Sequence, residues 1–193
     1  MKIKLFNLIV GLTIFIITIS VSYSHSEHYK NFNKIEMDVY RNGKIIGFSN
    51  YEFKYKKNIL EVMNNTEFEV KVLGVILFSI KSMSKEKYVN NQLVQFNSST
   101  LQNDKNKFVN LTFDKKLENF KVVGSSYKGV ADKNNIIGNW WNHEILKSNT
   151  QISPLSGSIK EQKVTFISKE VINIGNEDIE VKHFKLVSTD KNL

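Results

Sequence analysis

From position 34 onward, the apolar residues of this 193-residue chain recur at every second position rather than at every third or fourth. In the segment "IEMDVY", for example, Ile35, Met37 and Val39 alternate with charged or polar neighbours. Such alternation puts apolar side chains on one face of a β-strand, whereas a helix needs them three or four positions apart. Because no helical pattern of useful length interrupts the strands, units of alternating strand and helix are excluded and an all-β fold is predicted.

Short polar turns separate the predicted strands at regular intervals. Asn42-Gly43 is the strongest hairpin signal, because both residues tolerate a positive φ angle. Gly175-Asn176 marks another turn, and pairs of asparagine or aspartate occupy similar places elsewhere. Roughly nine strands joined in this way form an antiparallel meander, and a twisted sheet of that size is expected to curl into a barrel or half-barrel, with a sandwich as the alternative.

The segment "VLGVILFSIKSMSKEKYV", residues 72–89, begins as a continuous apolar run and then alternates. A strand that is buried on both faces at one end has this pattern. We therefore expect one strand here, with its first half inside the protein, where it either lines a cavity or packs a solid core.

The first residues, "MKIKLFNLIVGLTIFIITISVSYSHSEH", have the three parts of a secretory signal: early lysines, a long apolar run and a short polar end. Ser22 and Ser24 have the spacing that a signal peptidase needs. This predicts a signal peptide over residues 1–24, a flexible leader over 25–33 and a single β domain over 34–193 in the periplasm. The alternative is an uncleaved membrane anchor, since the apolar run approaches the length of a transmembrane helix. Cleavage leaves no integral membrane segment.

The net charge and the absence of cysteine limit the classes of binding partner and of site chemistry that are expected. The formal net charge is +8, and it falls to +6 when the charges of Lys2 and Lys4 are removed with the signal. A basic exported protein is attracted to anionic envelope surfaces, and nucleic acid is not an expected partner in that compartment. Because the chain has no cysteine, disulfides, a thiol nucleophile and thiolate metal sites are excluded.

Most of the residues that usually carry catalysis are isolated from one another, and His143, followed by Glu144, is the one histidine beside other candidate functional groups. His183 alternates with apolar and basic neighbours along a predicted strand, and Glu67 and Glu69 share a strand face that is expected to point to solvent. No catalytic residue, metal or cofactor is therefore predicted, and binding is favoured over enzymatic activity. One alternative stays open: cleavage ahead of His25 exposes an amine and an imidazole that, with His28, can bind a copper ion.

Both tryptophans lie side by side in "GNWWNHEIL", residues 138–146. Asparagine at 139 or 142 can cap a helix, so one short helix is expected near residues 139–147. In this helix Trp141 points inward. Two roles stay open for the pair, because the indoles either close one end of the core or form a lid over a cavity that the sheet encloses. Trp140 is the better candidate for contact with a ligand or partner.

Three segments carry a family resemblance. "MDVYRNGKIIG" and "VKVLGVILFSIKSMSKEKYVNNQLVQFNSST" resemble the opening and central hairpins, and "WN" the tryptophan-asparagine pair, of an exported bacterial family called domain of unknown function 6134. The resemblance spans Ile35 to Val187, and implies an exported β protein without implying an activity. The chain departs from the family at Asn90-Asn91, where a glycine turn is usual, and we expect it to lack the family's aromatic final strand. The matching residues are Asp38, Tyr40, Gly43, Gly47, Trp141 and Asn142.

Two hypotheses of function follow. The first is a periplasmic binding or carrier module that holds an apolar small molecule or lipid against the concave face of the sheet. The second is an envelope interaction or assembly protein that pairs its exposed sheet edges with another chain and has no small-molecule ligand. The candidate ligand-binding residues of the first hypothesis are Phe53, Phe68, Phe78, Phe96, Trp140, Trp141, Asn142 and His143.

Overall fold

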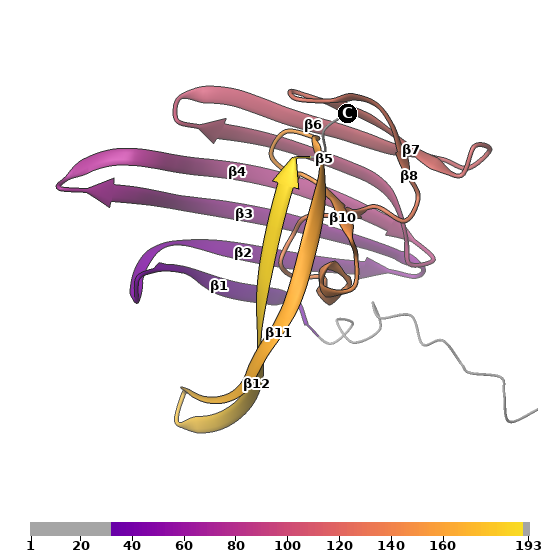
Figure 1. The fold of residues 1–193 in the computed structure, drawn as a ribbon. Coiled ribbons are helices and arrows are strands. Elements are labelled where there is room, and N and C mark those ends of the chain that lie inside the picture. The colour runs from indigo at the N-terminus through magenta and orange to yellow at the C-terminus, as the bar shows by residue number, and fades with distance from the viewer. Residues whose placement is uncertain (1–31, 191–193) are drawn as a thin grey trace, which may run out of the picture.

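The structure, a computed structural model, describes residues 32–190, and the chain in this range is built almost entirely of β-strands. Eight strands form an antiparallel meander in which each strand pairs with its neighbours in the chain, from β1 at one edge to β8 at the other (Figure 1). The predicted all-β fold and antiparallel meander are confirmed. The strands of this first sheet are β1 (Lys34–Arg41), β2 (Lys44–Lys56), β3 (Ile59–Val72), β4 (Val75–Val89), β5 (Gln92–Gln102), β6 (Lys105–Asp114), β7 (Asn119–Gly124) and β8 (Lys128–Asp132).

A second, smaller sheet crosses one face of the first sheet (Figure 1). Its strand order is β12-β11-β10-β9, with parallel pairing between β9 and β10 and antiparallel pairing between the others. The connection between β9 and β10 carries both tryptophans and one turn of 3-10 helix, η2 (His143–Leu146). The strands of the second sheet are β9 (Ile136–Ile137), β10 (Thr150–Ile152), β11 (Ile159–Ile174) and β12 (Glu177–Asp190).

The predicted hairpin turns have the expected backbone conformation. Asn42 and Gly43 have φ angles of 52° and 74°, and Asn90 and Asn91 have φ angles of 50° and 66°. Asparagine and glycine are the residues that adopt this left-handed region most readily, and two such residues in succession match the twist of the flanking strands. The turn chemistry therefore sets the register of the meander.

The core lies between the two sheets and follows the period-two pattern of the sequence. On β4, Ile80, Ser82, Glu86 and Tyr88 point toward the second sheet and are buried, whereas Met83 on the opposite face is 66 % exposed. Burial of one face only is what the alternation predicts for an antiparallel sheet. Six apolar side chains have no exposed surface: Val62, Phe96, Val109, Leu111, Val122 and Ile152.

The predicted closure into a barrel is not observed. β1 and β8 are the two edges of the first sheet and do not pair with each other within residues 32–190. The second sheet covers the core instead. The sequence does not predict this sheet, because β9 and β10 have two and three residues, too few to show an alternating pattern.

The expectation of one strand over residues 72–89 is wrong in its first part. Leu73 and Gly74 have φ angles of 50° and 81° and form the turn between β3 and β4. The residues that follow are not inside the protein, since Val75 is 60 % and Leu77 is 58 % exposed. The Leu-Gly pair takes the conformation that Asn-Gly takes in the first hairpin, so the apolar run lies at a hairpin tip.

The predicted helix is shorter than expected. It is a single 3-10 turn, and Asn142 caps it by accepting a hydrogen bond from the backbone N–H of Glu144. No helix in the described part of the chain is long and apolar enough to cross a membrane. The predicted signal peptide, and the leader up to residue 31, lie outside the described residues.

Candidate functional site

The loop between β9 and β10, residues 138–149, lies against the inner face of the first sheet and is called here the tryptophan loop. Its residue Trp141 is only 3 % exposed. The indole meets the ring of Phe53 edge-on at 5.4 Å between centroids and that of Tyr88 at 5.8 Å. Edge-to-face packing of this kind stabilises aromatic clusters beyond simple burial. Trp141 is therefore part of the core.

The indole N–H of Trp141 has a charged partner on β4. It donates a hydrogen bond to Oε1 of Glu86 at 3.0 Å, and the side-chain amide of Asn139 donates to the same oxygen at 2.7 Å. The hydroxyl of Tyr88 donates to Oε2 at 2.6 Å. Glu86 has no exposed surface. A carboxylate enclosed in a core thus receives three donors, two of which come from the tryptophan loop.

The environment of Glu86 favours the neutral form of its side chain. Burial raises the pKa of this carboxyl from its ordinary 4.5 to about 7, and the hydrogen bonds from Tyr88, Trp141 and Asn139 oppose the rise. Burial, followed by the neighbouring carboxylate, raises the pKa of the Tyr88 hydroxyl well above its ordinary value. The cluster therefore joins the loop to the sheet through groups whose protonation is sensitive to their surroundings.

The second sheet holds the tryptophan loop from the other side. The side-chain amide of Gln162, on β11, donates to the backbone carbonyls of Ile145 at 2.7 Å and Ser148 at 2.6 Å. At the start of the loop, a Cβ atom on Gly138 would lie 1.7 Å from the side-chain oxygen of Gln151, so only glycine fits there without a shift. The loop is fixed at both ends and in its middle.

A cavity of about 410 Å³ lies beside the tryptophan loop, between the inner face of the first sheet and the second sheet. Trp140 lines it with a side chain that is 61 % exposed. The backbone N–H of Trp140 donates to the hydroxyl of Tyr51 at 3.2 Å, which ties this residue to β2. The apolar part of the lining is formed by Tyr51, Phe68, Ile80, Trp140, Pro154, Leu155 and Leu186.

Polar side chains cover another part of the cavity wall. Asn64 and Thr66 of β3 belong to a network of short hydrogen bonds with Ser49, and Ser82 shares a hydrogen bond of 2.7 Å with Thr100. Lys160 of β11 adds a positive charge to the lining. The cavity therefore combines aromatic and aliphatic surface with hydroxyl, amide and ammonium groups.

A larger depression, of about 660 Å³, lies across β1 to β5 around Met63 and Met83, which belong to the outer face of the first sheet. It is a shallow hollow in one sheet, and the second sheet does not cover it. The smaller cavity is bounded by two sheets and a fixed loop, so it is the better candidate for a specific site.

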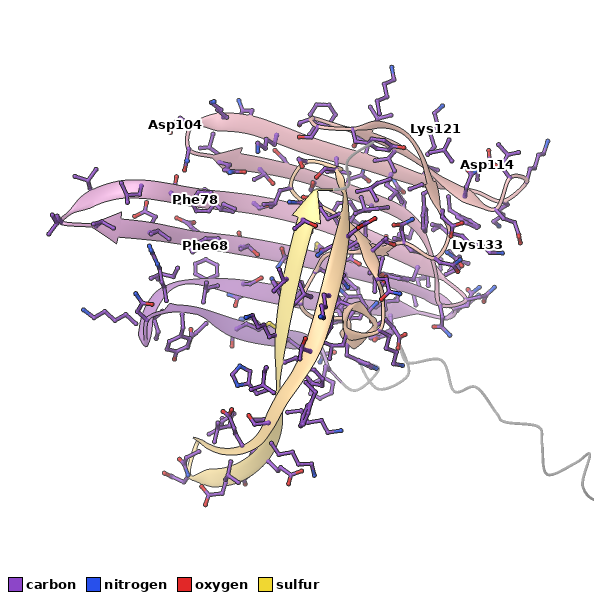
Figure 2. All side chains as sticks on the ribbon, in the orientation of Figure 1. Phe68, Phe78, Asp104, Asp114, Lys121 and Lys133 are labelled. Carbon is purple, nitrogen blue, oxygen red and sulfur yellow. The ribbon has the colours of Figure 1, made fainter. Side chains whose placement is uncertain are left out.

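The structure divides the predicted site residues into three groups. Phe53 and Phe96 are 4 % and 0 % exposed and fill the core. Phe68 and Phe78 lie side by side on β3 and β4, with ring centroids 5.9 Å apart, beyond the strands of the second sheet (Figure 2), and Phe68 also lines the cavity. The remaining residues belong to the tryptophan loop, where Trp140 lines the cavity, Trp141 is buried and Asn142 caps η2.

His143 lies on η2 with about a third of its side chain exposed, 3.6 Å from the carboxylate of Glu144. It does not belong to the cavity lining. The copper site suggested for His25 and His28 lies outside the described residues. Among residues 32–190, no group of three or more histidine, aspartate or glutamate side chains is placed to hold a metal ion.

Glu86 is the residue that the sequence analysis missed. The sequence signal is its position, since Glu86 lies an even number of residues from Ile80 and Tyr88 and therefore shares their inward face of β4. A glutamate in phase with apolar residues predicts a buried carboxylate with donors nearby. The partners themselves, Asn139 and Trp141, are more than fifty residues away in the chain.

These features define an all-β protein of two open, packed sheets, with a small cavity between them and a tryptophan-bearing loop at its wall. The family model described as "Domain of unknown function (DUF6134)" matches residues 37–193, and the chain belongs to this family. The resemblance stated from the sequence is therefore confirmed. Comparisons with curated proteins and with solved structures gave no match.

Proposed function

We propose that this protein is an exported binding module whose cavity holds a small amphiphile, with an apolar body and a polar head. The position of Trp140 carries the proposal. Its side chain is 61 % exposed and lines the cavity, although the adjacent tryptophan is buried. A large indole left at the mouth of a cavity is an apolar surface that a ligand can cover.

The hydrogen bonds around Glu86 support this role because they fix the position of Trp140. Trp141 and Asn139 are bound to Glu86, and the backbone of Trp140, between them, is bound to Tyr51. A binding wall that is already ordered loses little conformational freedom when a ligand arrives. The buried half of the loop thus preorganises its exposed half.

The volume and lining indicate the class of ligand. About 410 Å³ is toward the small end of the range of roughly 300–1,000 Å³ that is typical of small-molecule sites. Phe68, Leu155 and Leu186 suit a short acyl chain or a ring, while Lys160 and the hydroxyl groups suit an anionic or hydroxylated head. A medium-chain fatty acid has both properties and is the probe we would use.

Binding is favoured over catalysis by the position of Glu86. It is the carboxyl group with a raised pKa among the described residues, and such a shift is common at active sites. However, it has no exposed surface and does not line the cavity. Two of its three hydrogen bonds, those from Asn139 and Trp141, attach the tryptophan loop to β4.

Displacement of a fluorescent amphiphile tests the proposal. Anilinonaphthalene sulfonate should bind with increased fluorescence, and a medium-chain fatty acid should displace it. Trp140→Ala should lose most of this signal with an unchanged circular dichroism spectrum. Tyr40→Ala is the matched control, because Tyr40 is 59 % exposed and lies on β1 outside the cavity lining. Equal binding by both variants would show that the probe sits elsewhere.

A second candidate function rests on the edge of the second sheet. β12 pairs only with β11, so one side of a fourteen-residue strand is unpaired among the described residues. Such an edge can accept a strand from another chain, as an envelope assembly factor would require. Lys182→Pro, in the middle of β12 and four residues from the cavity-lining Leu186, should abolish complex formation under this alternative and leave amphiphile binding intact under the first.

A further inference from the structure

The hairpin of β3 and β4 extends beyond the rest of the first sheet. Pairing of β3 with β2 ends at Phe68, and pairing of β4 with β5 begins at Ile80. Residues 69–78, called here the β3–β4 tip, therefore pair only with each other, and Ser79 at their base is hydrogen-bonded to Asn103 of the β5–β6 turn. The four residues from Glu69 to Val72 continue β3 for about 13 Å beyond its last pairing with β2. Figure 1 shows this tip reaching past the neighbouring hairpins.

The β3–β4 tip is aliphatic on both of its faces. Leu73 is 99 % exposed, and Val75 and Ile76, adjacent residues of β4 in regular register with β3, are 60 % and 50 % exposed. Adjacent side chains of a strand point to opposite faces. A contiguous exposed apolar surface on a protein marks a site of interaction. Because both faces are apolar, the occupant has to surround the tip rather than cover one side.

Leu73 also occupies an unfavourable backbone conformation. It has a φ angle of 50°, and it is the apolar residue among the non-glycine positions with positive φ in the described chain. The hairpins at Asn42, Asn90 and Asn103 use asparagine at the equivalent turn position. Asparagine tolerates this region and leucine does not. A leucine that is both strained and fully exposed is not explained by folding.

Cations are in excess at this end of the first sheet. The turns of the β1–β2 and β5–β6 hairpins lie at the same end as the tip (Figure 1), and Asp104 in Figure 2 marks the second of them. Glu69 forms an ion pair of 2.8 Å with Lys71. Within four residues of the three turns the acids are Asp38, Glu69 and Asp104, and the cations are Arg41, Lys44, Lys71, Lys105 and Lys107.

We propose that the β3–β4 tip docks on an anionic phospholipid bilayer by inserting Leu73 and its aliphatic neighbours into the boundary between headgroups and acyl chains. The unpaired length of about 13 Å exceeds the roughly 5–10 Å depth of interfacial insertion. The bilayer surrounds the tip on both faces, and the flanking cations meet the anionic headgroups. The proposal does not depend on the cavity, and it assigns a second surface to the protein.

Co-sedimentation with vesicles tests this docking. The protein should bind vesicles of phosphatidylcholine that also contain phosphatidylglycerol, and bind vesicles of phosphatidylcholine alone much more weakly. Added salt should weaken the binding, because part of the attraction is electrostatic. Failure of the wild-type protein to sediment with anionic vesicles would overturn the proposal and point to a protein partner instead.

Leu73→Asn is the decisive variant, because it removes the inserted side chain and relieves the backbone. Its partition coefficient should fall by about tenfold or more, on the scale of one fully buried leucine. Leu117→Asn is the matched control, since Leu117 is 68 % exposed and lies in the β6–β7 turn at the opposite end of the sheet. Equal loss in both variants, or none in either, would refute insertion of the tip.

The contribution of the cations is tested by two double variants, one at each end of the first sheet. Arg41→Gln with Lys44→Gln should weaken binding to anionic vesicles by about tenfold or more, given roughly 1 kcal/mol for each cation near such a surface. Lys115→Gln with Lys116→Gln, at the opposite end, removes the same charge and should leave binding within about twofold, since charges beyond the Debye length are screened. A dependence on total charge alone would make both pairs equally weak and contradict a specific docking end.

Discussion

Replacing Glu86 by glutamine should remove most of the pH dependence that this residue gives to the stability of the protein. In the folded state the pKa of the carboxyl is about 7, whereas its ordinary value is 4.5. Below about pH 4.5 the group is protonated in both states, so it contributes no pH dependence. As the pH rises toward 7, the unfolded chain loses this proton first, which favours unfolding. Stability therefore falls through this window and levels off above about pH 7.

The size of the effect follows from the separation of the two pKa values. From 4.5 to about 7, at about 1.36 kcal/mol per pKa unit, it is about 3 kcal/mol. Glutamine keeps the shape of the side chain and an oxygen that can accept from Trp141 and Asn139, but it does not titrate. The unfolding free energy of the wild type, relative to that of Glu86→Gln, should fall by about 3 kcal/mol from about pH 4 to about pH 8.

Urea unfolding, followed by tryptophan fluorescence at several pH values, measures this difference. Trp141 is a suitable reporter because its indole is hydrogen-bonded to Glu86. Glu67→Gln is the matched control, since Glu67 is on the solvent-facing side of β3 and pairs with Lys81 at 3.5 Å. Parallel curves of stability against pH for wild type and Glu86→Gln would refute the assignment of a buried, titrating carboxyl.

Three further changes follow from individual contacts, each measured as a shift in unfolding free energy by urea titration. Trp141→Ala should cost about 3–5 kcal/mol and Trp140→Ala about 0.5 kcal/mol or less, and similar values for both would contradict the division between buried and exposed indoles. Gly138→Ala should cost about 1–3 kcal/mol, and the loss should largely disappear in a Gln151→Ala background unless some other atom causes the clash. Leu73→Asn should stabilise the fold by about 1 kcal/mol, and destabilisation would mean that the turn favours leucine.

The hairpins could be predicted because their determinants are local. A pair such as Asn42-Gly43 specifies its own backbone conformation, and the flanking alternation specifies which face is buried. The same reasoning did not predict the turn at Leu73-Gly74, because leucine is not a typical turn residue and lies within an apolar run. Reading glycine as the second residue of a two-residue turn would have divided the run correctly.

The second sheet and the cavity could not be predicted by the same means. β9 and β10 pair in parallel across the tryptophan loop, and a pairing of two residues leaves no periodic trace. The contact between Glu86 and Trp141 joins segments that only the three-dimensional fold brings together. The sequence did indicate that Trp141 is inside, because the expected helix geometry placed it there. Which surface Trp140 lines depends on how the two sheets stack.

The separate roles of the two tryptophans can be tested most directly by nuclear magnetic resonance of their indole N–H groups. The sequence has two tryptophans, so the spectrum should contain two indole signals. The Trp141 signal should exchange slowly with deuterated water and shift with a midpoint near pH 7, because its partner is the Glu86 carboxyl. Added medium-chain fatty acid should shift the Trp140 signal and leave the Trp141 signal almost unchanged. Rapid exchange of both indoles, or a fatty-acid response at Trp141 alone, would contradict a buried anchor beside an exposed binding residue.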